Sequence, residues 1–418
     1  MQRLLLTGLA LLALASPGTA RQGAAPEPLA LTDAKVVDVR TGRVAAGATI
    51  VLRDGRIESV GSGPAPGGVR VVPVAGRFVV PGLVDAHTHL ATLRAAQTAL
   101  ESGVTTIRSS GVSAYVDVGL RELVRSGALP GPDVLASGYH VRPRLAEEAF
   151  LTDPGLAPLL RRGVRTPADL RQVVQTNLAH KVDWIKVLAT ERAGTPDTDP
   201  RRQVYGEAEL RAVVEAAGGT PVQAHAHGDE GAQAAVRAGV RSIEHGTYLS
   251  ETTLSLMKAR GVFLVPTYTT VLDLLEPGGD YDQPALRLRG RHMASRLRET
   301  VQRAHRMGVK IVTGADTGYG PNSLTRISHE IVAFVEIGLT PLEALQAATT
   351  TAAELLRLEG RIGQVAPGFE ADLIVVERNP LEDPRTLEDV LMVISNGRVA
   401  LDRLGVPAAA PTAAEARP

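Results

Sequence analysis

The chain has 418 residues and carries 45 basic and 45 acidic side chains, so its formal net charge at pH 7 is zero. This balance gives no electrostatic reason to expect nucleic acid or an acidic membrane as a partner. The absence of cysteine excludes disulfides, thiolate metal sites and a catalytic thiol. Any metal site must therefore draw on the ten histidines, on carboxylates or on less usual ligands.

The N-terminus has the pattern of a secretory signal peptide. Arg3 precedes an apolar run over 4–15, and small residues precede a possible cleavage site after Ala20. The run is short for a membrane span. We therefore expect residues 1–20 to be removed, which implies a periplasmic or secreted protein with no stable membrane association after cleavage. An uncleaved leader or anchor is the alternative. The Ala/Pro-rich residues 406–418 are expected to form a disordered tail.

Short β-strand patterns occur near both ends of the chain. Each set is broken by glycine-rich turns, and the second contains an Asn396-Gly397 pair typical of a hairpin. Neither set is large enough to be stable alone. We therefore predict one small β-sandwich domain that combines residues 29–80 with residues 359–405.

Strand and helix patterns alternate between these two segments. Eight apolar segments end in polar residues: Leu83–His87, Val104–Ser109, Val134–His140, Trp184–Thr190, Val222–His227, Ser242–His245, Phe263–Tyr268 and Lys310–Asp316. Helical patterns separate them, which predicts an α/β fold with a (β/α)8 TIM barrel over residues 81–358. An open doubly wound sheet is the alternative, but the glycine fingerprint of that fold is missing after the first strand. In a barrel, chemistry takes place at the carboxyl ends of the strands.

Potential metal ligands occur at four of these strand ends: His87 and His89, His225 and His227, His245, and Asp316. Within each His-x-His pair, the spacing directs both rings to the same side of the strand. A lone histidine there is more often structural. Several converging imidazoles and a carboxylate, in contrast, suit Zn, Fe, Ni or Mn. The sequence therefore predicts a metal site at the mouth of the barrel.

Lys186 is unusual because it lies inside the apolar segment Trp184–Leu188. Lysine is rarely buried without a partner, and burial favours its neutral amine. A neutral amine can react with CO2 to give a carbamate, whose two oxygens can bridge two cations. A salt bridge to Asp183 is an equally good interpretation of the sequence.

These motifs together resemble the metal-dependent amidohydrolase superfamily. The resemblance covers residues 30–405 and rests on the segment PGLVDAHTH over 81–89, on Lys186, on the motifs HAH, SIEHG and TGAD, and on the closing segment GQVAPGFEADL. It is strongest to the imidazolonepropionase-like branch, which includes Xaa-Pro dipeptidases and ochratoxin-hydrolysing amidases.

The resemblance implies two divalent metal ions, by default zinc, and a CO2-derived carbamate on Lys186 that bridges them. The other implied ligands are His87 and His89 for the buried metal, His225 and His245 for the exposed metal, and Asp316. A metal-bridging hydroxide would attack a carbonyl, and Asp316 would act as general base and then as general acid. A helix N-cap is the alternative role for Asp316.

The implied reaction is hydrolysis of an amide or peptide C–N bond in a small substrate, namely a dipeptide or N-acyl amino acid, including ochratoxin-like amides. Hydrolysis of a cyclic amide or lactone and deamination are alternatives on the same centre, and a non-catalytic binding protein is an alternative of another class. Relatives are commonly homo-oligomers, so we expect one here.

Substrate contacts are harder to assign. His227 stands where many relatives have tyrosine, so it is a candidate for substrate or for metal. Further candidates are His140, Tyr139, Tyr268 and Arg144, with Arg108 and Arg142 as other cations for a substrate carboxylate. Each arginine also fits a solvated or salt-bridged surface position, and Tyr268 also fits a packing role at the barrel rim.

Overall fold

The computed structural model describes residues 25–278, 281–321 and 323–405. The predicted signal peptide over 1–20 and the predicted tail over 406–418 lie outside the described residues. Among the helices that are described, none has both the length and the apolar character of a transmembrane segment.

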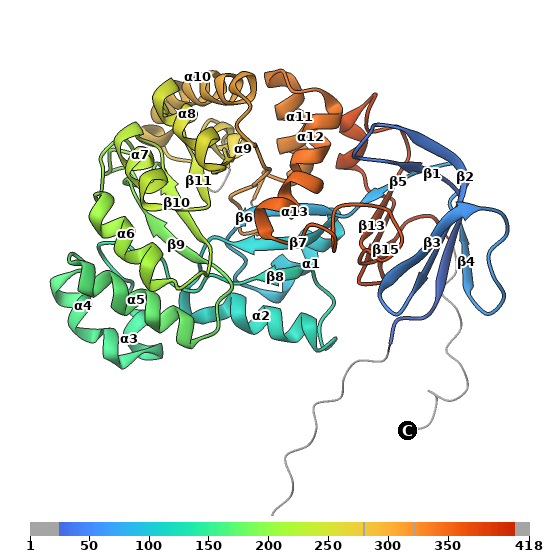
Figure 1. Cartoon of the computed structure of the whole chain (residues 1–418), viewed down its shortest axis with the longest axis horizontal. Helices are drawn as coiled ribbons and strands as arrows, with labels where there is room; N and C mark the ends of the chain where they lie inside the picture. Colours follow the sequence, from blue (N-terminus) through green and yellow to red (C-terminus); the bar gives the residue numbers. More distant parts are fainter. Residues whose placement is uncertain (1–24, 279–280, 322, 406–418) are drawn as a thin grey trace, which may run out of the picture.

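The two ends of the chain meet in one eight-stranded sheet, seen at the right of Figure 1. Its strands are β1 (Leu29–Val37), β2 (Val44–Arg53), β3 (Arg56–Ser62), β4 (Arg70–Pro73), β5 (Phe78–Pro81), β13 (Leu373–Val376), β14 (Met392–Ser395) and β15 (Arg398–Asp402). Their order is β15-β14-β13-β5-β1-β2-β3, and β4 pairs with β1. The late strand β13 runs antiparallel to β5, which joins the chain ends. The structure describes this region as a single sheet, so the two-layer sandwich and its boundaries stay predictions.

The turn between β14 and β15 is the predicted hairpin. Asn396 has a φ of 50° and Gly397 a φ of 75°, the left-handed conformation that a tight hairpin turn of this class requires. Asn and Gly tolerate this conformation better than other residues do, so the sequence pair determines where the strands reverse.

The described residues between the two terminal segments have an α/β architecture with seven regular parallel strands in two sheets. One sheet contains β6 (Leu83–Thr88), β7 (Val104–Ser109) and β8 (Asp133–Leu135), and the other contains β9 (Ile185–Leu188), β10 (Val222–Ala226), β11 (Ser242–His245) and β12 (Phe263–Val265). Isolated bridges link the two sheets: Val141 pairs with Val187, Leu264 with Ile311, and Thr88 with Thr317. The predicted ring of eight regular strands is therefore not closed by continuous pairing.

Three of the predicted strands differ from the structure. The third, predicted to run from Val134 to His140, is regular only over Asp133–Leu135 and is followed by an isolated bridge at Val141. The seventh ends at Val265 because Pro266 follows and Thr267 has a left-handed φ of 47°, and α9 begins at Tyr268. The eighth is irregular over 310–316, where Ile311 makes the bridge to Leu264.

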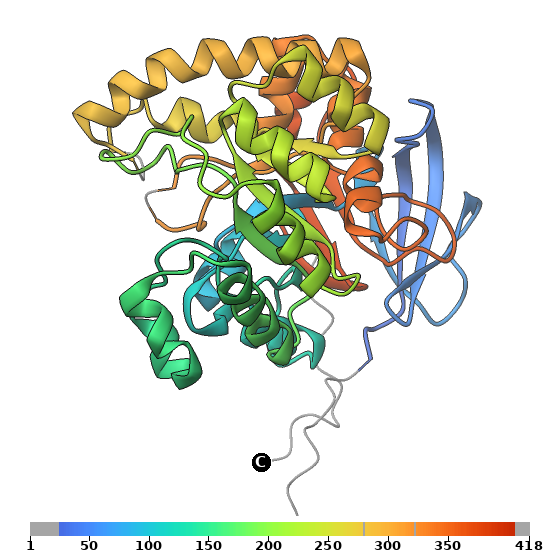
Figure 2. The same cartoon turned by 60° about the vertical axis from the view of Figure 1, so that its left-hand side comes forward.

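Helices surround the parallel strands in Figures 1 and 2. Their bounds are α1 (Leu93–Glu101), α2 (Val116–Arg125), α3 (Glu148–Thr152), α4 (Ala157–Arg162), α5 (Pro167–Ala179), α6 (Glu207–Ala216), α7 (Asp229–Ala238), α8 (Glu251–Arg260), α9 (Tyr268–Asp273), α10 (Pro284–Met307), α11 (Ile327–Ile337), α12 (Pro341–Ala347) and α13 (Thr350–Leu356). Local sequence determines several of their starts. Thr166, for example, caps α5 through a reciprocal bond with Asp169 and precedes a proline at the first helical position.

Candidate metal centre

The predicted metal ligands meet at the carboxyl ends of the parallel strands. One cavity of about 40 Å³ is lined by the whole set: His87, His89, Lys186, His225, His227, His245 and Asp316. Strand direction explains the convergence, because parallel neighbours end on the same side of the sheet. The structure therefore brings together every ligand that the resemblance implied.

The ligand atoms are close enough to share cations. The potential donor atoms of His225, His227 and His245 all lie within 4.8 Å of one another, and so do those of His87, His245 and Asp316. An oxygen of Asp316 lies 3.1 Å from His89 Nε2 and 3.5 Å from His87 Nε2. Because His245 belongs to both groups, the two sets of donors adjoin. His227 is placed where its ring can contact either a metal or a substrate.

Each imidazole is held through one ring nitrogen. The partners of Nδ1 are Glu244 Oε2 for His87, the Gly111 carbonyl for His89, Thr247 Oγ1 for His227 and Thr267 Oγ1 for His245, at 2.6–2.8 Å, while His225 Nε2 lies 3.2 Å from the Glu191 carbonyl. A carbonyl or carboxylate oxygen can only accept a hydrogen bond. The ring nitrogens of His87, His89 and His225 that contact such an oxygen therefore donate, and the other nitrogen of each ring keeps a lone pair. Such outer contacts orient metal-ligating histidines.

Burial favours the neutral form of four of these rings, those of His87, His225, His227 and His245. It lowers the pKa of His87, His225 and His245 well below the ordinary histidine value, and it lowers that of His227 to about 3. Neighbouring positive groups, including Lys186, lower the pKa values further. A neutral imidazole is the form that binds a cation, so the environment prepares the rings as ligands.

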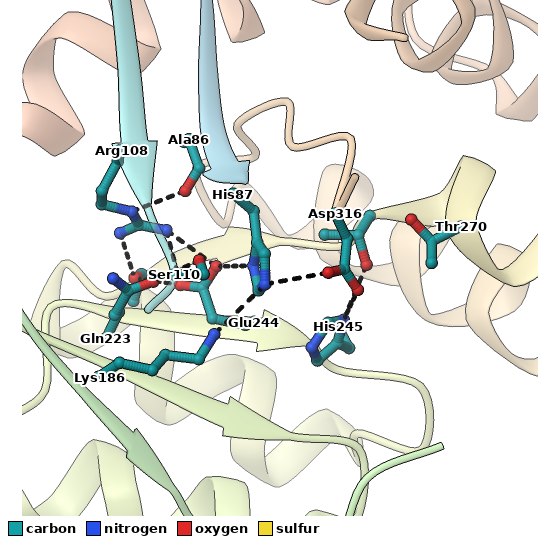
Figure 3. Close-up of polar contacts among 12 residues, drawn as sticks. Ala86, His87, Arg108, Ser110, Lys186, Gln223, Glu244, His245, Thr270 and Asp316 are labelled. Carbon is teal, nitrogen blue, oxygen red and sulfur yellow. Dashed lines mark hydrogen bonds and ion pairs between the residues drawn. The ribbon is translucent and has the colours of Figure 1, made fainter. Parts of the chain in front are cut away.

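Lys186 lies among these rings with 2% of its surface exposed. Its Nζ is 3.4 Å from His87 Nε2 (Figure 3). Burial lowers the pKa of Lys186 to about 8, although Glu244 and Asp316 raise it. The alternative partner Asp183 is engaged elsewhere, since it forms an ion pair with Arg121 and accepts a bond from the Ala136 amide. The pairing of Lys186 with Asp183 is therefore wrong.

A buried ion pair between Arg108 and Glu244 supports His87 at its Nδ1 atom (Figure 3). Arg108, with 0% of its surface exposed, donates to both oxygens of Glu244 at 2.9 and 2.8 Å and to the Ala86 carbonyl at 2.6 Å. Glu244 in turn accepts from His87 Nδ1. The candidate role of Arg108 in binding a substrate carboxylate is therefore wrong, because its guanidinium is buried and fully engaged.

Asp85 holds the segment that carries Asp316. Its carboxylate accepts from the His87 and Ala315 amides at 3.0 and 3.1 Å and from the Tyr319 hydroxyl at 2.8 Å. Asp316 has a left-handed φ of 44°, which an L-residue rarely adopts without support. The bonds from Asp85 join β6 to this segment and supply that support.

These donors fit divalent cations. Neutral imidazoles, a carboxylate and a buried lysine converge on one small cavity, and imidazole with carboxylate is a donor set that divalent transition metals bind well. His87, His89, His225, His245 and Asp316 could hold a metal here.

The predicted substrate contacts divide into two groups. His140 and His227 line the cavity, and His140 Nε2 is buried without a hydrogen-bond partner among the described residues. Three others lie away from it. The Tyr139 hydroxyl accepts from the Ala114 amide and borders a neighbouring hollow, Tyr268 is buried at the start of α9, and Arg144 is exposed. These three residues do not line the metal cavity, and their predicted role in binding substrate stays a prediction.

Among the cavity-lining residues that sequence reasoning missed are Arg192 and Tyr281. Both lie in irregular segments, where no periodicity indicates which way a side chain points. Arg192 had one usable signal, because it follows the predicted fourth strand at its carboxyl end, where barrels place their chemistry.

Comparisons with known proteins agree with this geometry. Ochratoxinase of Aspergillus niger is 28% identical over 350 residues, which is 74% of this chain and 72% of ochratoxinase. Imidazolonepropionase of Symbiobacterium thermophilum is 26% identical over 391 residues, covering 81% and 85% of the two chains. A solved Xaa-Pro dipeptidase with bound methionine in the active site superposes with a TM-score of 0.79 at 28% identity, covering 89% of this chain and 99% of the dipeptidase.

The family model described as the amidohydrolase family matches residues 78–400, which include all the cavity-lining histidines, Lys186 and Asp316. The α/β fold is the one that TIM-barrel amidohydrolases share. The chain therefore belongs to the amidohydrolase family, and it is a hydrolytic enzyme that acts on C–N bonds.

Proposed function

We propose that this enzyme hydrolyses the amide bond of a dipeptide or an N-acyl amino acid at a centre of two divalent cations. Zinc is the default ion, because imidazole and carboxylate ligands suit it. The observation that carries the proposal is the placement of Lys186, a buried lysine in contact with His87 in a cavity lined by neutral imidazoles.

The Lys186 amine has the properties that carbamate formation requires. Burial favours the neutral amine, whose lone pair can form an N–C bond to CO2 with release of one proton. The product is an anion with two oxygens, and it would replace a nearby positive charge with a negative one. Two cations would stabilise that anion, and His87 with His89 and His225 with His245 would complete their coordination.

When bound, such cations lower the pKa of water and polarise a carbonyl oxygen. The chain supplies the proton transfer. Asp316 lies at the cavity with 12% of its side chain exposed, and its carboxylate would accept the proton of the attacking water and return it to the leaving amine. The bonds from Asp85 to the Ala315 amide and to Tyr319 keep this carboxylate in place. His140 and His227 are positioned to orient the substrate.

The substrate class is supported by the relatives. The solved dipeptidase holds methionine, an amino acid with a free carboxylate, and ochratoxinase takes its name from ochratoxin. The imidazolonepropionase relative supports a second candidate, hydrolysis of a cyclic amide on the same centre. A non-catalytic binding protein would have no need to keep every ligand position, and all of them are kept here.

Three further expectations belong to this proposal. We expect the eight barrel positions to close through the isolated bridges, the leader over 1–20 to be cleaved on export, and the protein to form a homo-oligomer. N-terminal sequencing of the exported protein and size-exclusion chromatography with light scattering test the last two.

The test of the proposed function is a hydrolysis screen on zinc-loaded protein. N-acyl amino acids and Xaa-Pro, Xaa-Arg and Xaa-Phe dipeptides would be compared with cyclic amides for wild type and Lys186→Ala. Lys258→Ala, a change at an exposed lysine, is the matched control. We expect wild type and Lys258→Ala to cleave a linear amide and Lys186→Ala to be inactive. Full activity and metal content in Lys186→Ala would contradict the bridging role.

A further inference from the structure

Two arginines flank the metal cavity without a protein partner among the described residues. Arg192, in the segment after β9, lines the cavity itself. Arg142, in the segment after β8, lines the adjoining hollow of about 100 Å³. His140 lines both spaces, so the two arginines approach the same corner of the site.

Neither guanidinium forms an ion pair or hydrogen bond with any residue in the described part of the chain. Glu191 is next to Arg192 in the sequence but does not pair with it. Its Oε1 lies 3.6 Å from Arg202 Nη1, and its Oε2 accepts a hydrogen bond from the Asp199 amide. Burial lowers the pKa of Arg142, and the charge of Arg192 lowers it further. Glu148 raises the pKa by a smaller amount. An anion between or beside two guanidinium groups in a partly buried space would relieve the repulsion between them.

The position of Arg192 is fixed by the rest of the fold. Arg289 on α10 donates to the carbonyls of Ala193, Thr195, Pro196 and Thr198, which are the residues just beyond Arg192. The Tyr281 ring packs against Gly194, where an added Cβ would come within 2.6 Å of it. These contacts fix the backbone that carries Arg192, so binding an anion would not require this segment to become ordered.

Part of the remaining wall of the cavity is apolar and is formed by Leu188, Val271 and Leu274. The site therefore offers three features side by side: the proposed metal centre, an apolar wall and the two arginines. A linear amide with an apolar side chain and a free carboxylate would contact all three at once.

We propose that Arg192 and Arg142 bind the free carboxylate of the substrate and so restrict this enzyme to amides of amino acids with an unblocked C-terminus. The inference rests on the proposed amide hydrolysis and deepens it. Arg192 is the principal contact because it lines the metal cavity, and Arg142 is the second. A guanidinium is suited to this task because its planar fork matches a carboxylate.

The test compares two probes on zinc-loaded protein, N-acetyl-L-phenylalanine and N-acetyl-L-phenylalaninamide, with acetate release as the readout. Hydrogen bonds to a charged group stabilise a bound carboxylate strongly, so Arg192→Ala should lower kcat/KM for the acid by about 100-fold. For the amide, which has no carboxylate, the loss should be less than about threefold. Arg192→Lys should retain more activity toward the acid than Arg192→Ala, since it keeps the charge but loses the fork. Arg144→Ala, at an exposed arginine of the same segment as Arg142, is the control and should match wild type.

Binding is measured separately, by calorimetry with the same two compounds on zinc-loaded wild type, Arg192→Ala and Arg142→Ala. We expect both variants to weaken binding of the acid, and neither to change binding of the amide. An equal loss for acid and amide, or no loss for the acid, would overturn the assignment. If wild type cleaves no linear amide, the proposed function fails, while the calorimetry still decides whether these arginines hold a carboxylate. Circular dichroism of each variant identifies a folding defect. If Arg192→Ala is misfolded, Arg192→Gln is used in its place.

Discussion

The buried pair of Arg108 and Glu244 gives the sharpest prediction about stability and metal affinity together. Arg108→Met removes a guanidinium that makes two bonds to Glu244, one to Ser242 Oγ and one to the Ala86 carbonyl. Both members of the pair are fully buried, so the remaining carboxylate would be left without its cation. Removing one partner of a buried pair costs about 3–5 kcal/mol of folding free energy.

Arg108→Met should also weaken binding of metal at the candidate centre. Glu244 holds His87 Nδ1 at 2.6 Å, and a carboxylate released from Arg108 would hold that ring less firmly. Loss of such an outer contact typically weakens metal affinity about 10- to 100-fold. Urea unfolding at pH 7 measures the first quantity, and titration of apo-protein with zinc against a competing chelator measures the second.

Two controls isolate the pair. Arg125→Met changes a half-exposed arginine whose nearest acidic oxygens are 3.9 Å away, so it should cost less than about 1 kcal/mol. The double variant Arg108→Met with Glu244→Gln removes the orphaned charge, and should be less destabilised than the sum of the single variants. A loss below about 1 kcal/mol in Arg108→Met with unchanged zinc affinity would refute the reasoning.

Three other changes test separate parts of the structure. Gly314→Ala would place a Cβ 2.7 Å from His87 Cβ, so we expect a loss of about 1–3 kcal/mol in urea unfolding. Tyr319→Phe removes the hydroxyl that supports the Asp316 segment, and should lower kcat with little change in KM. Glu343→Gln should flatten the dependence of Tm on acid pH, since capping bonds from Thr340 lower the pKa of Glu343 to about 2.

The outcomes that would contradict these three predictions are specific. For Gly314, the control is Gly318→Ala, where the nearest atom to the added Cβ lies 3.6 Å away; an equal loss in both would remove the steric argument. For Tyr319→Phe, a kcat equal to that of wild type would contradict the prediction. For Glu343, the lowered pKa means that its stabilisation is present above about pH 4.5 and lost as the pH falls toward 2. A variant with the wild-type acid profile would contradict that assignment.

Sequence patterns predicted the elements that local physics determines. The bounds of β7 and β11 are those expected, and in β7 the β-branched residues of the run VTTI explain the strand. The His-x-His spacing likewise placed its rings correctly, since strand alternation alone determines which side they face. The end of β12 was missed, because its apolar run continues past Pro266 into a different conformation.

Other features depend on partners far away in the chain. Arg108 and Glu244 are 136 positions apart, so nothing near Arg108 indicates that its guanidinium is buried. Arg192 lies in an irregular segment whose position depends on bonds from Arg289 on α10. Tertiary contacts of this kind decide which arginines face the cavity, and residue spacing does not report them.

If Lys186 helps to hold two cations, the amount of metal bound per chain must depend on this residue. Wild type, Lys186→Ala and Lys258→Ala would be purified with zinc and bicarbonate, and their metal content measured by mass spectrometry. We expect two equivalents of zinc per chain in wild type and Lys258→Ala, and one or fewer in Lys186→Ala. Two equivalents in Lys186→Ala, or no bound metal in wild type, would contradict this expectation.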